Sequence, residues 1–250
     1  MENYTTQMDA ARKGIITPEM KIVAKKEHMA VEALRDLVAK GQVAICANKK
    51  HTCLNPEGVG SMLRTKINVN LGVSRDCKDY NIEMEKVMSA VNMGAEAIMD
   101  LSSHGNTQPF RQKLTSECPA MIGTVPIYDS VIHYQRDLAE LTAKDFIDVV
   151  RLHAEDGVDF VTLHCGITRK TIDQIKKHKR KMNIVSRGGS LVFAWMRQEK
   201  RTRSMNILMK FLISVRNMML RSPSEMHVVR AVWQTRLTYA RLKNWYVWAS

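Results

Sequence analysis

The feature of this sequence that most constrains its fold is a regular alternation of short apolar segments with longer helical patterns between residues 66 and 196. Segments of strand length begin at Lys66, Ala97, Met121, Phe160 and Asn183. Helical patterns at 81–92, 108–117, 142–155 and 168–179 lie between them. This alternation predicts a parallel α/β sheet with right-handed crossovers. Five strands suffice for a doubly wound sheet, whereas a (β/α)8 barrel has eight strands and typically about 250 residues.

Residues 1–65 have a different character. Thr17 is a capping residue, Pro18 occupies the first helical position and an acidic residue follows, which predicts a helix that continues to Gly41. The stretch after it, residues 43–60, is rich in Gly, Asn and Pro and predicts a loop. We therefore expect an N-terminal helical and loop segment over 1–65 and the α/β region over 66–196.

The net charge of +13 is unevenly distributed. Residues 197–250 hold eleven Lys or Arg and two acidic residues, a net charge of +9, which leaves +4 for residues 1–196. They also contain no Gly and three of the four Trp residues. Two compositions therefore meet near Met196, and residues 197–250 form a basic tail unlike the rest.

The cysteines and the hydropathy pattern bear on the location of the chain. Five Cys residues without a C-x-x-C pair favour reduced thiols over a disulfide framework or a zinc ribbon. Residues 1–14 lack the apolar core of a signal peptide, and no window approaches 18 uncharged apolar residues. We expect a cytoplasmic chain that does not enter a membrane.

Ligands of parallel α/β proteins bind at the carboxyl ends of the strands. The residues expected there are Asn68, Asn70, Met99, Asp100, Tyr128, His164, Cys165, Ser186, Arg187 and Gly188. The run 186–189, Ser-Arg-Gly-Gly, offers a hydroxyl, a guanidinium and open backbone N–H groups, which suit a phosphate, although an ordinary Gly-rich turn has the same composition.

The other candidates each have a structural alternative. His164 suits a general acid or base, or a contact to a substrate oxygen, and also a buried histidine with satisfied hydrogen bonds. Asn68 and Asn70 share one face of a strand and suit a heterocycle or sugar, or hydrogen bonds to neighbouring strands. Met99 suits the core and Tyr128 the rim of a barrel. Cys118 and Cys165 are expected to be small buried hydrophobes, and the basic run 176–181 a solvated helix face.

Seven segments together resemble one family, the phosphomethylpyrimidine synthases of thiamine biosynthesis. They are A-N-K-K-H at 47–51, N-P-E-G-V-G at 55–60, K-I-N-V-N-L-G-V-S at 66–74, M-D-L-S at 99–102, I-G-T-V-P-I-Y at 122–128, H-A-E-D-G-V-D-F-V-T-L-H-C-G at 153–166 and S-R-G-G-S-L-V-F-A-W-M at 186–196. Strings of this length in this order are highly specific, and the resemblance covers essentially residues 1–196.

The resemblance implies a (β/α)8 TIM barrel, of which this chain holds about the first five β/α units. It also implies a homodimeric radical S-adenosylmethionine lyase that converts 5-aminoimidazole ribonucleotide to 4-amino-5-hydroxymethyl-2-methylpyrimidine phosphate, releasing formate and carbon monoxide. By motif match the substrate contacts fall on Asn70, Met99, Tyr128, His164, Ser186, Arg187 and Gly188. All of these residues are among the strand-end candidates. The basic groups of residues 1–196 then need to bind only a phosphorylated small molecule, and we expect no nucleic acid or membrane as partner.

In the family, the sequence that follows these segments carries a D-x-x-R-P-G motif, a substrate-binding Glu, a His-ligated zinc site and a C-x2-C-x4-C motif. The last of these binds the [4Fe-4S] cluster that cleaves S-adenosylmethionine. This sequence contains none of them. No catalytic residue or metal ligand can therefore be assigned to it, and we expect it to be inactive.

The tail can be interpreted as the family's sequence in another reading frame. Codons chosen for residues 204–211 give Tyr-Glu-Tyr-Phe-Asp-Glu-Ile after a frame shift, a family-like run, and those for 225–231 give Asp-Ala-Cys-Arg-Pro-Gly. The sequence therefore predicts a frameshift near residues 196–200. The alternative is a genuine basic helical tail that binds nucleic acid or an anionic surface.

Overall fold

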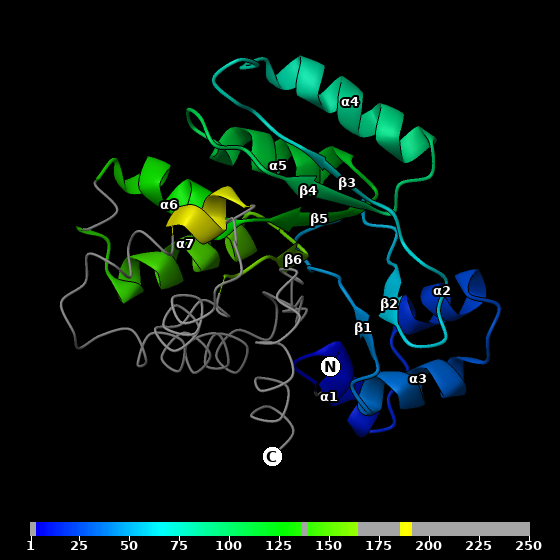
Figure 1. Ribbon diagram of the computed structural model, residues 1–250. Coiled ribbons are helices and arrows are strands. Elements are labelled where there is room, and N and C mark those ends of the chain that lie inside the picture. The colour runs from blue at the N-terminus through cyan, green and yellow to red at the C-terminus, as the bar shows by residue number, and fades with distance from the viewer. Residues whose placement is uncertain (1–3, 137–139, 165–185, 192–250) are drawn as a thin grey trace, which may run out of the picture.

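The computed structural model describes residues 4–136, 140–164 and 186–191, and its centre is a parallel sheet (Figure 1). Its strands are β3 (Asn68–Leu71), β4 (Ala97–Asp100), β5 (Met121–Thr124) and β6 (Phe160–Val161), in the order β3-β4-β5-β6. Every neighbouring pair is parallel, which confirms the predicted α/β class. The fifth predicted strand begins at Asn183, outside the described residues.

Two helices cover one face of this sheet, α4 (Tyr80–Asn92) and α5 (Gln108–Glu117) (Figure 1). Side chains alternate between the two faces of a strand, so one face of each strand supplies the core beneath the helices. The strand residues Val69, Leu71, Ile98 and Ile122 pack there with Met84, Val87, Phe110 and Leu114 of the helices. The other face carries Asn68, Asn70, Ala97, Met99, Met121 and Gly123.

Two further helices flank β5 and β6. α6 (Pro126–Tyr134) begins two residues after β5, because Pro126 at the first helical position fits a helix start and cannot continue the strand ladder. Tyr128 therefore lies in the first turn of α6. α7 (Ala143–Glu155) begins with the predicted capping box, in which the Thr142 hydroxyl accepts from Asp145 N at 3.3 Å and the Asp145 carboxylate accepts from Thr142 N at 2.7 Å.

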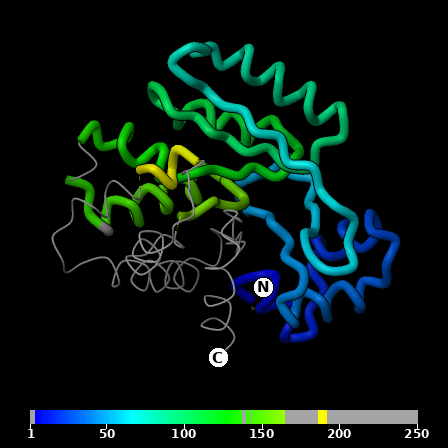
Figure 2. Tube along the Cα trace, viewed as in Figure 1, coloured from blue at the N-terminus to red at the C-terminus, as the bar shows by residue number. Residues whose placement is uncertain are grey.

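The N-terminal segment packs around a core of its own at one end of the sheet (Figure 2). It contains α1 (Gln7–Arg12), α2 (Pro18–Lys26), α3 (Val31–Ala39), β1 (Val43–Ile45) and β2 (Gly58–Gly60). The single helix predicted from Thr17 to Gly41 is divided, since His28 adopts a left-handed φ of 52° that ends α2. The stretch predicted as a loop contains the antiparallel pair β1–β2.

The segment between β1 and β2 crosses to the sheet and is fixed there by Asn48. The backbone N–H of Asn48 donates to Asp159 Oδ1 at 2.8 Å, and its amide nitrogen donates to the carbonyls of Ala154 and Val158 at 2.9 and 3.0 Å. These bonds close the amino-terminal end of the strands and leave the carboxyl ends for ligands. Within the described ranges, no helix has the length and apolarity needed to cross a membrane.

Candidate functional site

The first part of the candidate site lies on the sheet face away from α4 and α5. Asn70 is exposed there and pairs in register with Met99, which in turn pairs with Gly123. The amide nitrogen of Asn68 donates to Asn70 Oδ1 at 3.0 Å, so the two predicted amides share this face. Gly123 leaves room for the Phe160 ring, whose nearest atom would lie 2.2 Å from a Cβ at that position.

Met99 joins the sheet to α6. It is 4% exposed and packs in a cluster with Val125 and Ile127, against which Tyr128 also lies. The Thr162 hydroxyl donates to the Met99 sulfur at 3.9 Å. Met99 is therefore a core residue at the strand end, with Asn70 on one side and Tyr128 on the other.

His164 and the 186–191 segment form the second part of the site. His164 Nε2 lies 3.2 Å from Ser186 Oγ, which also accepts from Gly189 N at 2.9 Å. Gly188 is needed for close approach, since a Cβ there would lie 2.3 Å from Cε1 of His164. Burial lowers the pKa of His164, which favours the neutral imidazole. Its Nδ1 atom is buried and has no hydrogen-bond partner among the described residues.

Arg187 connects this segment to two loops. Its guanidinium carbon lies 5.6 Å from the centre of the Tyr128 ring, within the range of a cation–π contact. Its Nη1 atom donates to Ser103 Oγ, in the loop that follows β4. The structure thus brings Tyr128, His164, Ser186, Arg187 and Gly188 together through direct contacts, and Asn70 joins them only through the strand that carries Met99.

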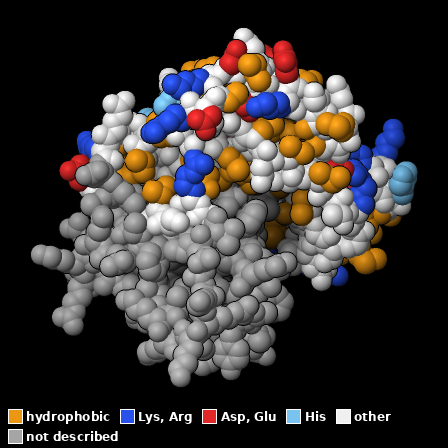
Figure 3. Space-filling view, turned by 45° about the horizontal axis from the view of Figure 1, so that its top comes forward, with side chains coloured by type: hydrophobic (Ala, Val, Ile, Leu, Met, Phe, Trp, Pro, Cys, Tyr) orange, Lys and Arg blue, Asp and Glu red, His pale blue; other side chains and the backbone are white. Residues whose placement is uncertain are grey.

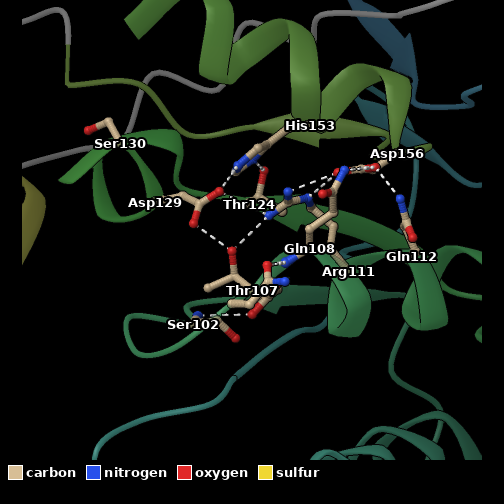
Figure 4. Close-up of polar contacts among 12 residues, drawn as sticks. Ser102, Thr107, Gln108, Arg111, Gln112, Thr124, Asp129, Ser130, His153 and Asp156 are labelled. Carbon is tan, nitrogen blue, oxygen red and sulfur yellow. Dashed lines mark hydrogen bonds and ion pairs between the residues drawn. The ribbon is translucent and has the colours of Figure 1, made fainter. Parts of the chain in front are cut away.

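A buried polar network beneath α6 was not predicted from the sequence (Figure 4). Asp129 Oδ2 accepts from His153 Nε2 at 3.0 Å and pairs with Arg111 Nη1 at 3.3 Å. His153 Nδ1 lies 2.8 Å from the Thr124 hydroxyl. Arg111 also pairs with Asp156, 2.8 Å from Nη2. The only sequence signal was His153 and Asp156 within the string at 153–166, and nothing there indicates their partners.

The ionisation of this network follows from its contacts. Burial alone would raise the pKa of Asp129, but the bonds from His153 and Thr107 and the charge of Arg111 outweigh it and lower that pKa to about 2. Burial lowers the pKa of His153 to about 4. At neutral pH the network therefore holds an Asp129 carboxylate, a neutral His153 and the Arg111 cation.

Polar, aromatic and guanidinium groups at the carboxyl ends of parallel strands are typical of α/β enzymes that act on small molecules. The sequence profile of the Radical SAM ThiC family matches residues 6–215. The chain belongs to this family, which confirms the resemblance drawn from its motifs.

Three similar proteins are each named phosphomethylpyrimidine synthase. The phosphomethylpyrimidine synthase of Alkaliphilus oremlandii (strain OhILAs) is 64% identical over 193 residues, which are 77% of this chain and 44% of that protein. The synthase of Clostridium botulinum (strain Loch Maree / Type A3) is 59% identical over 194 residues, 78% of this chain and 44% of its own length. That of Clostridioides difficile (strain 630) is 60% identical over 194 residues, with shares of 78% and 45%. The chain thus spans less than half the length of these relatives.

The family's name implies a [4Fe-4S] cluster and S-adenosylmethionine, and such clusters are held by Cys thiolates. Cys46 and Cys118 are buried. Burial raises the pKa of the Cys46 thiol and raises that of Cys118 to about 11, so both stay protonated at neutral pH. In the part of the chain that the structure describes, no group of three His, Cys, Asp or Glu residues could hold a metal ion. These residues do not fit the cluster or a zinc ion.

Proposed function

We propose that this chain is the substrate-binding part of a phosphomethylpyrimidine synthase, a cytoplasmic enzyme that forms the pyrimidine of thiamine from 5-aminoimidazole ribonucleotide. The observation that carries the proposal is the convergence of Arg187, Tyr128 and His164 at the strand ends. A guanidinium, an aromatic ring and a neutral imidazole match the phosphate and the heterocycle of such a ligand. The names of the relatives support the same substrate class.

The contacts suggest a role for each group. Arg187 uses one nitrogen on Ser103 and keeps other N–H groups for the phosphate, with the Ser186 hydroxyl and the backbone at Gly188 beside it. His164 forms one hydrogen bond with the ligand through its Nδ1 atom, which has no partner among the described residues. Asn70 offers an exposed amide, and Met99 and Tyr128 supply apolar surface.

The face shown in Figure 3 fits a small ligand better than a polyanion. On the face shown in Figure 3, Lys and Arg side chains lie in separate groups, with acidic and hydrophobic side chains between them. A nucleic-acid site generally needs basic residues gathered on one face. We therefore propose no role for this face in binding nucleic acid.

We further propose that β3 to β6 are the first strands of a (β/α)8 barrel that this chain alone does not close. The cluster, S-adenosylmethionine and zinc would be held by parts of the family's fold that this sequence lacks, and the cluster would supply the radical. We propose that the chain by itself is inactive, and that the homodimerisation implied by the resemblance belongs to the complete fold. Anaerobic reconstitution with iron and sulfide tests this: we expect no stoichiometric absorbance from a cluster, and such an absorbance would contradict the proposal.

Residues 197–250 are proposed to be an out-of-frame translation. The nucleotide sequence around codons 190–205 tests this directly. We expect an alternative frame there that encodes the continuation of the relatives' sequence. A single open frame without such an extension would show that the basic tail is genuine.

Binding of 5-aminoimidazole ribonucleotide to the full chain, measured by calorimetry, tests the main proposal. We expect the ribonucleotide to bind about ten to a hundred times more tightly than its unphosphorylated riboside, because charge-assisted bonds to the phosphate contribute about 1.5–3 kcal/mol. Arg187→Ala should remove most of this difference. Arg151→Ala, which removes a half-buried Arg on α7 paired with Asp148, is the matched control and should leave the difference intact. Equal affinity for the two ligands would overturn the proposal.

A further inference from the structure

We propose that Asp129 is a positioning residue that aligns the two supports of Arg187, the Tyr128 ring and the Ser103 hydroxyl. The inference rests on the proposed function, since Arg187 is taken there as the phosphate ligand. The Asp129 carboxylate has its printed polar contacts with Thr107, Arg111 and His153, none of which is assigned to the substrate. Asp129 acts through the elements that carry the two supports.

The first support is reached through α6. Asp129 follows Tyr128 in the first turn of this helix, and successive helical residues point about 100° apart. Tyr128 faces the Met99 cluster and Arg187, while Asp129 faces the polar network between α5 and α7 (Figure 4). A rotation or shift of α6 that moved Asp129 would therefore carry the Tyr128 ring with it.

The second support is reached through the loop that precedes α5. Asp129 Oδ1 accepts a 2.5 Å hydrogen bond from the Thr107 hydroxyl. Thr107 ends the loop between β4 and α5, and this loop also contains Ser103, whose hydroxyl accepts from Arg187. The Asp129 carboxylate, which stands on the helix of Tyr128, thus also holds the loop that contains Ser103.

The orientation of His153 makes this arrangement specific. Asp129 is an acceptor only, so His153 Nε2 must carry the proton that faces it. Because the imidazole is neutral, Nδ1 then accepts from the Thr124 hydroxyl at 2.8 Å. Thr124 is the last residue of β5, so the network connects the strand end directly to the first turn of α6. Burial of His153, which is 2% exposed, keeps water from competing for these bonds.

The test compares two variants that each remove a buried carboxylate from Arg111. Asp129→Asn removes the one on α6, whereas Asp156→Asn removes the one at the end of α7, away from Tyr128. Asparagine keeps one oxygen that can accept from the Thr107 hydroxyl, and Arg111 keeps its pair with Asp156, so the first variant should fold. We expect Asp129→Asn to lower ribonucleotide affinity about tenfold with little change for the riboside. Asp156→Asn should lower the melting temperature but leave the affinity ratio unchanged.

A double-mutant cycle distinguishes positioning from general destabilisation. If Asp129 acts through Arg187, Asp129→Asn should cost little further ribonucleotide affinity in the Arg187→Ala background. Additive losses in that background, or equal losses from Asp129→Asn and Asp156→Asn, would overturn the inference. Should Asp129→Asn fail to fold, Thr124→Val removes the donor to His153 with little change of shape and is expected to lower the affinity ratio in the same direction.

A ligand-free measurement separates this inference from the proposed function. In the chain labelled with 3-fluorotyrosine, the Tyr128 signal can be assigned by its loss in Tyr128→Phe. We expect Asp129→Asn to shift or broaden this signal and Asp156→Asn to leave it in place. If the wild-type chain does not bind the ribonucleotide, the proposed function fails, and the fluorine signal still decides whether Asp129 positions Tyr128. An unchanged signal in Asp129→Asn would overturn the positioning role.

Discussion

His51 Nδ1 lies 2.7 Å from the Asp159 carboxylate, and both side chains are fully buried. The other ring nitrogen of His51, Nε2, lies 2.7 Å from the carbonyl oxygen of Cys118. Because both nitrogens face oxygen acceptors, both carry a proton and the imidazole is a cation. Asp159 also accepts from the backbone of Asn48 and Ile122 at 2.8 and 2.7 Å, which satisfies the paired carboxylate. This ion pair joins the segment after β1 to the amino-terminal end of the sheet.

The pair predicts a loss of stability at alkaline pH. Burial opposes the charged imidazole, but the bond and charge of Asp159 and the Cys118 carbonyl outweigh it and raise the pKa of His51 above 6.5. Burial also raises the pKa of Asp159. The His51 contribution is thus complete below pH 6.5 and is lost as the pH rises through the folded-state pKa. Urea unfolding between pH 6 and 9 should show this fall, and His51→Gln should flatten it.

Removing one partner of this pair is expected to be severe. Asp159→Asn leaves a buried imidazolium without its counter-charge, and the loss of a partner from a buried ion pair costs about 3–5 kcal/mol. Unfolding by urea at pH 6 measures it. The matched control is Asp148→Asn, which breaks a partly solvent-exposed pair with Arg151 and should cost at most about 1 kcal/mol. Similar losses in the two variants would contradict the ion-pair assignment.

At Asp100, by contrast, removing the charge is predicted to stabilise the chain. Burial raises the pKa of this carboxyl from 3.8 to about 6, so the folded state disfavours its charged form. The resulting penalty is absent below pH 3.8 and is complete above pH 6. Asp100→Asn keeps an oxygen that can accept from Ser102 N, now at 2.9 Å, and removes the charge. We expect it to stabilise the chain by about 1–2 kcal/mol at pH 8 and by much less at pH 4, as measured by urea unfolding at both values.

Local sequence signals predicted the elements that depend on local chemistry. The pattern at 108–117 gave α5 with the bounds found, and Thr142 with Asp145 gave the capping box of α7. Strand starts at Ala97 and Met121 agree with the structure as well. His28 shows the limit of this reasoning, because a left-handed residue other than Gly has no clear sequence signal and the division of the N-terminal helix was missed.

The polar pairs could not be predicted, because they form between distant parts of the chain. His51 and Asp159 are separated by 108 positions, and Asp129 and His153 by 24. No periodicity links such residues, and their roles depend on burial that only the packed sheet creates. The positions of the site candidates could be predicted because the carboxyl ends of parallel strands meet at one edge, so the order of strands alone placed His164 near that edge. Their role in binding stays a prediction.

Gly188 provides a direct test of the site geometry. Gly188→Ala would place a methyl group 2.3 Å from Cε1 of His164 and 2.9 Å from Cγ2 of Ile127. Both are side-chain atoms that can move, so we expect the fold to survive and the imidazole to be displaced. Ribonucleotide affinity measured by calorimetry should fall about tenfold, since one hydrogen bond to a neutral group contributes about 0.5–1.5 kcal/mol. Ser190→Ala, at an exposed position of the same segment, is the control and should bind normally. Unchanged affinity in Gly188→Ala would show that His164 does not contact the ligand.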